Sequence, residues 1–272
     1  MLVVFTILPI AAAAALSFFR WDLLTRPDFV GLGNFIELAG DEAFRAALLH
    51  TLLFIAGYLP TVMVVGLGLA LLLDRRSRLA GVSRVVFFMP VVSAWVAVAL
   101  IWKWMLNSRF GIINWALDSI GIEGPAWLFE RGWAMLSVIA ASVWKDAGFV
   151  MILFLAGLQT IPAEYQEAAR MDGANPWQAF WRVTFPLLSP TVFLVSIILL
   201  INSFQVFEQV WILTQGGPLG STTVVVERIV KTAFSFGRMG YAASMSWVLF
   251  AFIFAITLLQ ARLQNRWVHY GG

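Results

Sequence analysis

The 272-residue sequence contains no cysteine, only two histidines, and no phosphate-binding loop of the form G-x-x-x-x-G-K-[ST]. Without cysteine, disulfides, thiolate metal sites and cysteine nucleophiles are excluded. The histidines, His50 and His269, lie at the boundaries of apolar runs and provide too little for a histidine metal site or a Ser-His-Asp triad. Without the loop, the chain has no recognisable ATPase site. We therefore expect no catalytic residue, no bound cofactor and no metal in this chain.

Charged residues are also scarce. They make up 12% of the sequence, whereas hydrophobic residues make up 61%. Soluble proteins average roughly 25% charged and roughly 45–50% apolar residues. The composition therefore indicates an integral membrane protein, which is embedded in the lipid bilayer. The net charge of +3 reflects membrane topology and not binding to nucleic acid, because no basic patch is interleaved with aromatic residues.

Continuous apolar runs predict an all-α fold of about six transmembrane helices in a single domain, residues 1–272. Each run is long enough to cross roughly 30 Å of hydrocarbon. The runs do not alternate polar and apolar residues as the strands of a membrane barrel would. The predicted spans are residues 1–19, 49–73, 85–106, 134–158, 187–213 and 242–259. A secretory signal is the competing interpretation of the first run, but the run has no basic start and further spans follow it.

The arginines predict the orientation of the spans. Four of them lie in the short segment that follows span two, and two more follow span six. They are Arg75, Arg76, Arg78, Arg84, Arg262 and Arg266. By the positive-inside rule both segments are cytoplasmic. The segment between spans four and five, residues 160–186, and the C-terminus are then cytoplasmic as well.

Residues 164–190, EYQEAARMDGANPWQAFWRVTFPLLSP, carry the strongest helix signals between two spans. Residues 165–171 predict a short helix, and residues 172–175 predict a turn because Gly and Asn tolerate a left-handed backbone. Asn175 and Pro176 predict the N-cap and first position of a second helix with an aromatic stripe, which ends at Pro186. On the residues alone, the segment is an interfacial loop whose aromatic rings rest among lipid headgroups.

Two groups of polar residues lie inside predicted spans four and five. An ionisable group at that depth costs on the order of 2.5–3.5 kcal/mol even on the lenient insertion scale, so it should face a cavity or a partner. The groups are Ser142, Lys145 and Asp146, and Asn202, Ser203, Gln205, Glu208 and Gln209. They either join helices through polar contacts, with Lys145 paired to Asp146 or Glu208, or line a hydrophilic path for a substrate. The density of polar residues in span five favours the path.

Glu167-Ala168-Ala169, Gly173 and the residues VTFP at 183–186 resemble the EAA loop of binding-protein-dependent ABC importer permeases. The family pattern is EAA, three residues, Gly, nine residues and I-x-L-P. All spacings match, with Val183 and Phe185 in place of Ile and Leu. The resemblance extends over essentially the whole chain, through FVGLGNF at 29–35, MP at 89–90, SFQVF at 203–207 and TQGGP at 214–218. The last two segments are similar to the carbohydrate-uptake branch, in particular to the first permease of the maltose and glycerol-3-phosphate importers.

This resemblance implies a permease subunit of an ATP-driven importer for a sugar or related polyol in a prokaryotic inner membrane. It implies four kinds of partner: a second homologous permease, two ATPase subunits that hold ATP and Mg, an extracytoplasmic solute-binding protein, and the transported sugar. The loop would be the cytoplasmic coupling helix that docks on the ATPase. Its implied coupling residues are Glu167, Ala168, Ala169, Asp172, Gly173 and Pro186. By position, the implied sugar path includes Trp95, Ser142, Asp146, Ser203 and Gln205.

Other classes of protein stay open at this point. An ion-coupled secondary transporter or channel, working as a homo-oligomer, would use Lys145, Asp146 and Glu208 as a relay. Among ABC importers, glycerol-3-phosphate or another organic phosphate is the alternative to a sugar. An enzyme acting on lipids has no catalytic set in the sequence to support it.

Overall fold

The structure is a computed structural model that describes residues 1–74 and 78–267, with side chains up to Gln264. Arg75, Arg76, His269 and the side chain of Arg266 lie outside the described residues. The described chain is almost entirely helical, which confirms the predicted all-α membrane fold. Four of its helices are long and apolar enough to cross a membrane, or five if one bent pair is counted as a span.

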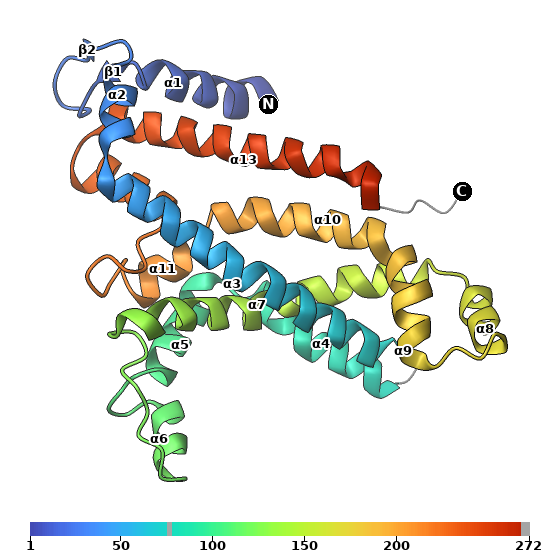
Figure 1. Cartoon of the computed structure of the whole chain (residues 1–272). Coiled ribbons are helices and arrows are strands. Elements are labelled where there is room, and N and C mark those ends of the chain that lie inside the picture. The colour runs from blue at the N-terminus through green and yellow to red at the C-terminus, as the bar shows by residue number, and fades with distance from the viewer. Residues whose placement is uncertain (75–77, 268–272) are drawn as a thin grey trace.

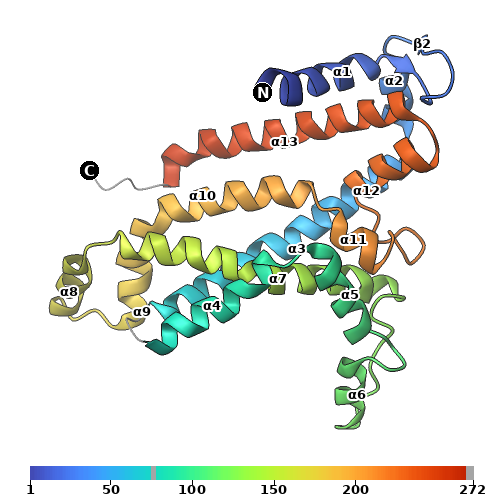
Figure 2. The same ribbon diagram turned by 180° about the vertical axis from the view of Figure 1, so that it is seen from behind.

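The long helices run along one another, and short helices lie at both ends of the bundle (Figures 1 and 2). The long helices are α3 (Glu42–Leu73), α7 (Arg131–Gln159), the continuous run α9 (Pro176–Ala179), η2 (Phe180–Thr184) and α10 (Phe185–Phe204), and α13 (Met239–Trp267). The shorter helices are η1 (Val3–Ile7), α1 (Leu8–Leu16), α2 (Gly33–Gly40), α4 (Arg78–Val92), α5 (Trp95–Met105), α6 (Ile112–Asp118), α8 (Ala163–Met171), α11 (Glu208–Leu213), α12 (Val225–Val230) and η3 (Lys231–Ser235). We call the two ends of the bundle the α8 end and the α6 end.

Predicted spans two, four and six correspond to α3, α7 and α13, which are long and apolar enough to cross a membrane. The helix in predicted span one covers only Val3–Leu16, which is shorter than the roughly 20 residues that a crossing needs. The side-chain amide of Asn34 donates to the carbonyl oxygens of Ser17 and Phe19, and so satisfies groups just beyond the end of this helix. The chain then forms two short antiparallel strands that the sequence did not predict, β1 (Phe19–Arg20) and β2 (Asp28–Phe29).

The prediction of span three as one helix is wrong, because α4 and α5 meet at 99°. Pro90 has no N–H to donate within α4, which weakens the helix just before the break. The hydroxyl of Ser93 then donates to the carbonyl of Met89, and Ala94 takes an extended conformation with ψ 138°. Predicted span five is also interrupted, since α10 ends at Phe204 and α11 begins only at Glu208.

The prediction that Pro186 ends the preceding helix is also wrong. Proline is tolerated in the first turn of a helix, where a missing N–H costs little. Here the five-residue π-helical turn η2 precedes α10, and the Phe185 N–H bonds to the carbonyl of Phe180. The helical run changes direction sharply between α9 and α10 (Figure 1) but continues from Pro176 to Phe204.

Glycines allow α7 to pack closely on α3 and α4. A Cβ atom on Gly66 of α3 would lie 2.4 Å from Val150 Cγ1 of α7. A Cβ atom on Gly148 of α7 would lie 2.0 Å from the carbonyl oxygen of Phe87 in α4. Small residues at such positions let helix backbones approach closely. In a membrane the hydrophobic effect does not drive helices together, so their association depends on van der Waals packing.

We expect Gly148→Ala to destabilise the protein by about 1–3 kcal/mol, the usual cost of overpacking, because the new methyl group would overlap the Phe87 carbonyl. Thermal unfolding in detergent, followed by tryptophan fluorescence, measures the effect. Gly68→Ala is the matched control, since Gly68 is also helical and a Cβ atom added there would have no neighbour within 4 Å. Equal loss of stability in both variants would contradict this explanation.

Candidate functional site

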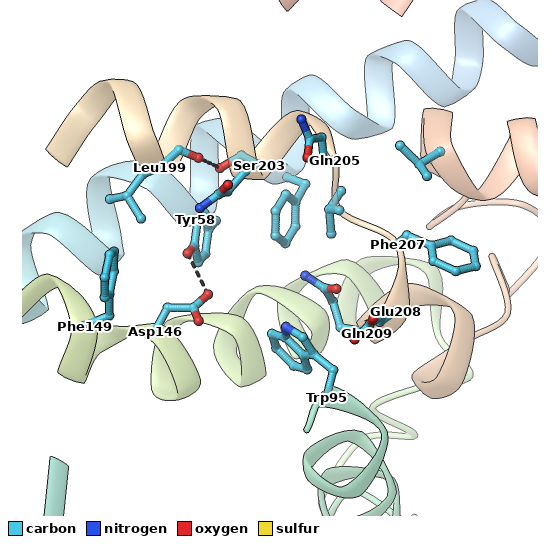
Figure 3. Close-up of a pocket in the computed structure, with 14 residues that line it drawn as sticks. Tyr58, Trp95, Asp146, Phe149, Leu199, Ser203, Gln205, Phe207, Glu208 and Gln209 are labelled. Carbon is cyan, nitrogen blue, oxygen red and sulfur yellow. Dashed lines mark hydrogen bonds between the residues drawn. The ribbon is translucent and has the colours of Figure 1, made fainter. Parts of the chain in front are cut away.

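A cavity of about 550 Å³ lies where the two broken helices meet α3 and α7 (Figure 3). Its walls are Phe54, Tyr58, Trp95, Asp146, Phe149, Leu199, Asn202, Ser203, Gln205, Val206, Phe207, Glu208, Gln209 and Val226. Seven residues of the predicted path are among them: Trp95, Asp146, Asn202, Ser203, Gln205, Glu208 and Gln209. The structure thus brings most of the predicted set together around one space, while the role of these residues in transport stays a prediction.

The breaks in the helices build this cavity. Trp95 is the first residue of α5 and Glu208 is the first residue of α11, while Asn202 and Ser203 lie in the last turn of α10. Inside a membrane, non-helical backbone is tolerated where it lines a cavity or is buried in protein. The interruption of span five therefore lets polar groups from successive turns face one space. A straight helix would point the same groups in several directions.

Asp146 is held in the cavity wall by a residue that the sequence-based prediction missed. The Tyr58 hydroxyl of α3 donates to Asp146 Oδ2 over 2.7 Å (Figure 3). The Tyr58 ring stacks on Phe54, with ring centroids 5.2 Å apart. A signal was available, because Thr51 and Tyr58 are polar residues seven positions apart in a mostly apolar run and so share one face of the helix.

Lys145 and Ser142 lie outside the cavity lining. Lys145 is 6% exposed, donates from Nζ to the carbonyl of Val91 over 3.1 Å, and lies 5.2 Å from the centre of the Trp95 ring. The break after α4 leaves its last carbonyl groups without a following helical turn to donate to them, and a cation there also suits the negative end of the helix. The Ser142 hydroxyl donates to Val138 in its own helix. The alternative pairing of Lys145 with Asp146 or Glu208 is not formed, and Lys145 and Ser142 do not line the cavity as the predicted path required.

The segment that carries α11 and α12 is hydrogen-bonded to the helices around the cavity. The Val225 N–H donates to Thr51 Oγ1 of α3, and Lys103 Nζ of α5 donates to the carbonyl of Ile212. Because α11 and α12 contribute Glu208, Gln209 and Val226 to the lining, these contacts hold one wall of the cavity in place.

Two carboxylates at the α6 end strengthen this wall. Glu227 of α12 is fully buried and forms an ion pair with Lys231, one helical turn further on. Asp41, the N-cap of α3, lies 3.9 Å from Arg228. Burial raises the pKa of Asp41, but hydrogen bonds from Tyr241 and the Phe44 N–H outweigh it and hold the pKa below its ordinary value. Asp41 therefore stays ionised opposite Arg228.

The predicted helix, turn and helix of residues 164–186 are present at the α8 end (Figure 1). Gly173 has φ +78°, its N–H bonds to the carbonyl of Arg170, and the next N–H bonds to the carbonyl of Ala169. This pair of bonds is the Schellman arrangement, in which glycine ends a helix at the left-handed position. Asn175 and Gln178 then form a capping box at the start of α9.

The proposed coupling residues differ in exposure. Glu167, Ala168, Asp172 and Gly173 are exposed, whereas Ala169 is buried. Pro186 lies in the first turn of α10. The exposed face of α8 is therefore open to another protein, while Ala169 packs inward.

Comparison with known proteins identifies one family. The family described as "Binding-protein-dependent transport system inner membrane component" matches residues 62–269. The chain is 35% identical over 271 residues to the probable ABC transporter permease protein YesP of Bacillus subtilis, covering 98% of this chain and 87% of YesP. It is 31% identical over 262 residues to the trehalose/maltose transport system permease protein MalF of Thermococcus litoralis, covering 96% of this chain and 88% of that protein.

A solved structure has the same fold. It is that of a bacterial ABC transporter involved in the import of the acidic polysaccharide alginate. The match has a TM-score of 0.85 and covers 97% of this chain and 91% of the other, at 24% sequence identity.

Proposed function

The chain belongs to the family of binding-protein-dependent transport system inner membrane components, and on that premise we propose that it is one of two permease subunits of an ATP-driven importer for a sugar or related polyol. The family relation makes it a multi-pass membrane protein of an ABC transport system. The nature of the substrate, the coupling to an ATPase and the orientation in the membrane are parts of the proposal.

The observation that carries the proposal is the cavity between the broken helices. Its polar groups are the amides of Asn202, Gln205 and Gln209 and the carboxyl groups of Asp146 and Glu208. Amides and carboxylates accept hydrogen bonds from sugar hydroxyls, and amides also donate. Trp95 offers an aromatic face on which a sugar ring can stack. This combination of an apolar wall with a few polar groups is typical of a small-molecule site.

A continuous helix joins the coupling loop to this cavity. The run from Pro176 to Phe204 begins beside the exposed residues of α8, and its last turn contributes Asn202 and Ser203 to the cavity wall. We propose that closure of an ATPase dimer pulls on the loop, moves α10 and exposes the cavity alternately to the two sides. Such a lever requires the ATPase to contact the loop differently in its two states.

The proposed assembly contains this chain as a single permease domain, a homologous second permease, two ATPase subunits with ATP and Mg, and an extracytoplasmic binding protein. It lies in the cell membrane of a prokaryote. The arginines after spans two and six support an orientation in which the α8 end and the C-terminus are cytoplasmic and the α6 end is outside.

An affinity pull-down of the tagged chain from its native membrane tests this proposal. We expect an ATPase and a second permease of similar size to co-purify, and we expect the purified chain alone to hydrolyse no ATP. Recovery of this chain alone, or ATP turnover by it, would contradict the proposal. Transport by a homo-oligomer that depends on a proton gradient would favour the ion-coupled alternative.

Asp146→Ala and Gln205→Ala are each expected to weaken uptake by the assembled transporter, by about tenfold if one hydrogen bond to a charged or well-placed group is lost. Assembly with the partners should be unchanged, because neither side chain contacts another subunit in this proposal. Radiolabelled uptake into proteoliposomes and co-purification measure the two properties. Normal uptake by both variants would mean that these residues only join helices.

A further inference from the structure

The charges on the cavity wall point to the class of substrate. Among the described residues that line the cavity, the charged side chains are Asp146 and Glu208, and none is lysine or arginine. The other polar groups are neutral amides and hydroxyls. Carboxylates that share one cavity repel each other, and a negatively charged ligand placed there would add to this repulsion.

The lysines of the chain do not belong to the cavity lining. The sequence has three, on or beside the helices that form the cavity. Lys145 donates to the carbonyl of Val91, Lys103 to that of Ile212, and Lys231 to that of Gln215. Lys231 is in addition paired with Glu227. Each ammonium group thus donates to the protein's own backbone and none belongs to the cavity lining, with Lys145 placed beside the Trp95 ring that forms part of the wall.

The fold does not decide the charge of the substrate. The same fold occurs in a transporter of acidic alginate, while the relative MalF serves a trehalose/maltose system. Selection between acidic and uncharged sugars therefore depends on side chains in the cavity.

We propose that this site selects glycosides without acidic groups and rejects phosphorylated, sulfonated and uronic-acid sugars. The inference rests on the proposed function, and it removes glycerol-3-phosphate and other organic phosphates from the candidates. Glu208, which is exposed at the start of α11, is the carboxylate that opposes a negatively charged ligand, and Asp146, which accepts a hydrogen bond from Tyr58, is the second acidic group in the wall.

The test uses the complete transporter with its partner subunits and binding protein in proteoliposomes. Two probes of equal ring number, maltotriose and trigalacturonate, are compared by uptake. We expect maltotriose to be preferred and Glu208→Lys to reduce that preference at least about tenfold, since reversing a charge exchanges repulsion for attraction. Glu208→Gln, which keeps the shape, should reduce it less. Glu123→Lys is the control, because Glu123 is exposed in the loop between α6 and α7.

Preferential uptake of trigalacturonate by the unmodified transporter would overturn the inference, and so would an equal change of preference in the Glu208 and Glu123 variants. Failure of the proposed function would be seen in a separate measurement, ATP hydrolysis by the purified assembly without any sugar. No ATP hydrolysis there would contradict the proposed function, whatever the sugar preference. An assembly that takes up trigalacturonate with ATP hydrolysis would keep the proposed function and lose only the selectivity argued here.

Discussion

Gly173→Val is expected to reduce uptake by the assembled transporter at least about tenfold while ATP hydrolysis continues. A residue with a Cβ atom in the left-handed region costs roughly 1–2 kcal/mol, and a tenfold change in an equilibrium corresponds to about 1.4 kcal/mol. Gly173 adopts φ +78°, and a β-branched side chain suits that region poorly. The variant should therefore give up the turn that joins α8 to α9. The proposed ATPase contact would then no longer be connected rigidly to α10.

The chain contains a closely matched control for this experiment. Gly121 has φ +77°, and nothing lies within 4 Å of a Cβ atom added there, as at Gly173. It ends α6 with the same pair of bonds, from its own N–H to Asp118 and from the Ile122 N–H to Leu117. Gly121→Val introduces equal backbone strain at the α6 end, far from the proposed coupling loop. Its uptake per ATP hydrolysed should stay near that of the unmodified transporter.

The ratio of sugar transported to ATP hydrolysed is the deciding quantity. A low ratio for Gly173→Val alone supports a role of the turn in coupling. Asparagine tolerates the left-handed conformation, so Gly173→Asn should restore much of the ratio. Normal transport by Gly173→Val would rule out this role, and the same fall in the Gly121 variant would attribute the effect to general loss of stability.

Lys231→Met is expected to destabilise the protein by about 3–5 kcal/mol, the usual result of removing one partner of a buried ion pair. Glu227 is fully buried, and Lys231 is the cation paired with it. Lys231 also donates to the carbonyl of Gln215 over 2.9 Å and lies 5.9 Å from the centre of the Trp211 ring. Methionine keeps the length of the side chain but leaves the carboxylate of Glu227 without a counter-charge.

Thermal and denaturant unfolding in detergent measure this loss. The double variant Glu227→Gln, Lys231→Met should recover part of the stability, because it removes the buried charge together with its partner. Glu37→Gln is the control, since Glu37 and Arg238 form an exposed pair at the same end of the bundle. Exposed pairs contribute only about 0–1 kcal/mol. A Lys231→Met protein as stable as the Glu37 variant would show that the buried charge needs no partner.

The helix, turn and helix of the proposed coupling loop could be predicted closely because their signals are local. Asn175, Pro176 and Gly173 act on neighbours within a few residues, through an N-cap, a fixed φ and a left-handed turn. The apolar runs likewise predict α3, α7 and α13, since hydrocarbon thickness sets their length. Pro186 is a local signal that gave a wrong prediction, the end of a helix, because the π-helical turn before it lets the helix continue.

The arrangement of the cavity could not be predicted from such local signals. Polar residues in spans four and five identify most of its wall, but not the breaks that arrange them. Tyr58 was missed because its partner Asp146 is 88 positions away. Lys145 was expected either on the substrate path or paired with a carboxylate, but it donates to the carbonyl of Val91, 54 positions away. The sequence pattern offers no way to rank these partners.

By itself, the sequence determined the membrane class, the all-α fold, the two short helices and the turn of the proposed coupling loop, and the polar character of spans four and five. Only the tertiary structure decided that spans three and five are broken, that Tyr58 holds Asp146, and that the lysines donate to backbone carbonyls and do not line the cavity. The reason is physical. Helix caps, turns and apolar lengths depend on groups a few residues apart, whereas the partner of a buried polar group is whichever distant backbone or side chain the packing of helices brings within hydrogen-bonding distance.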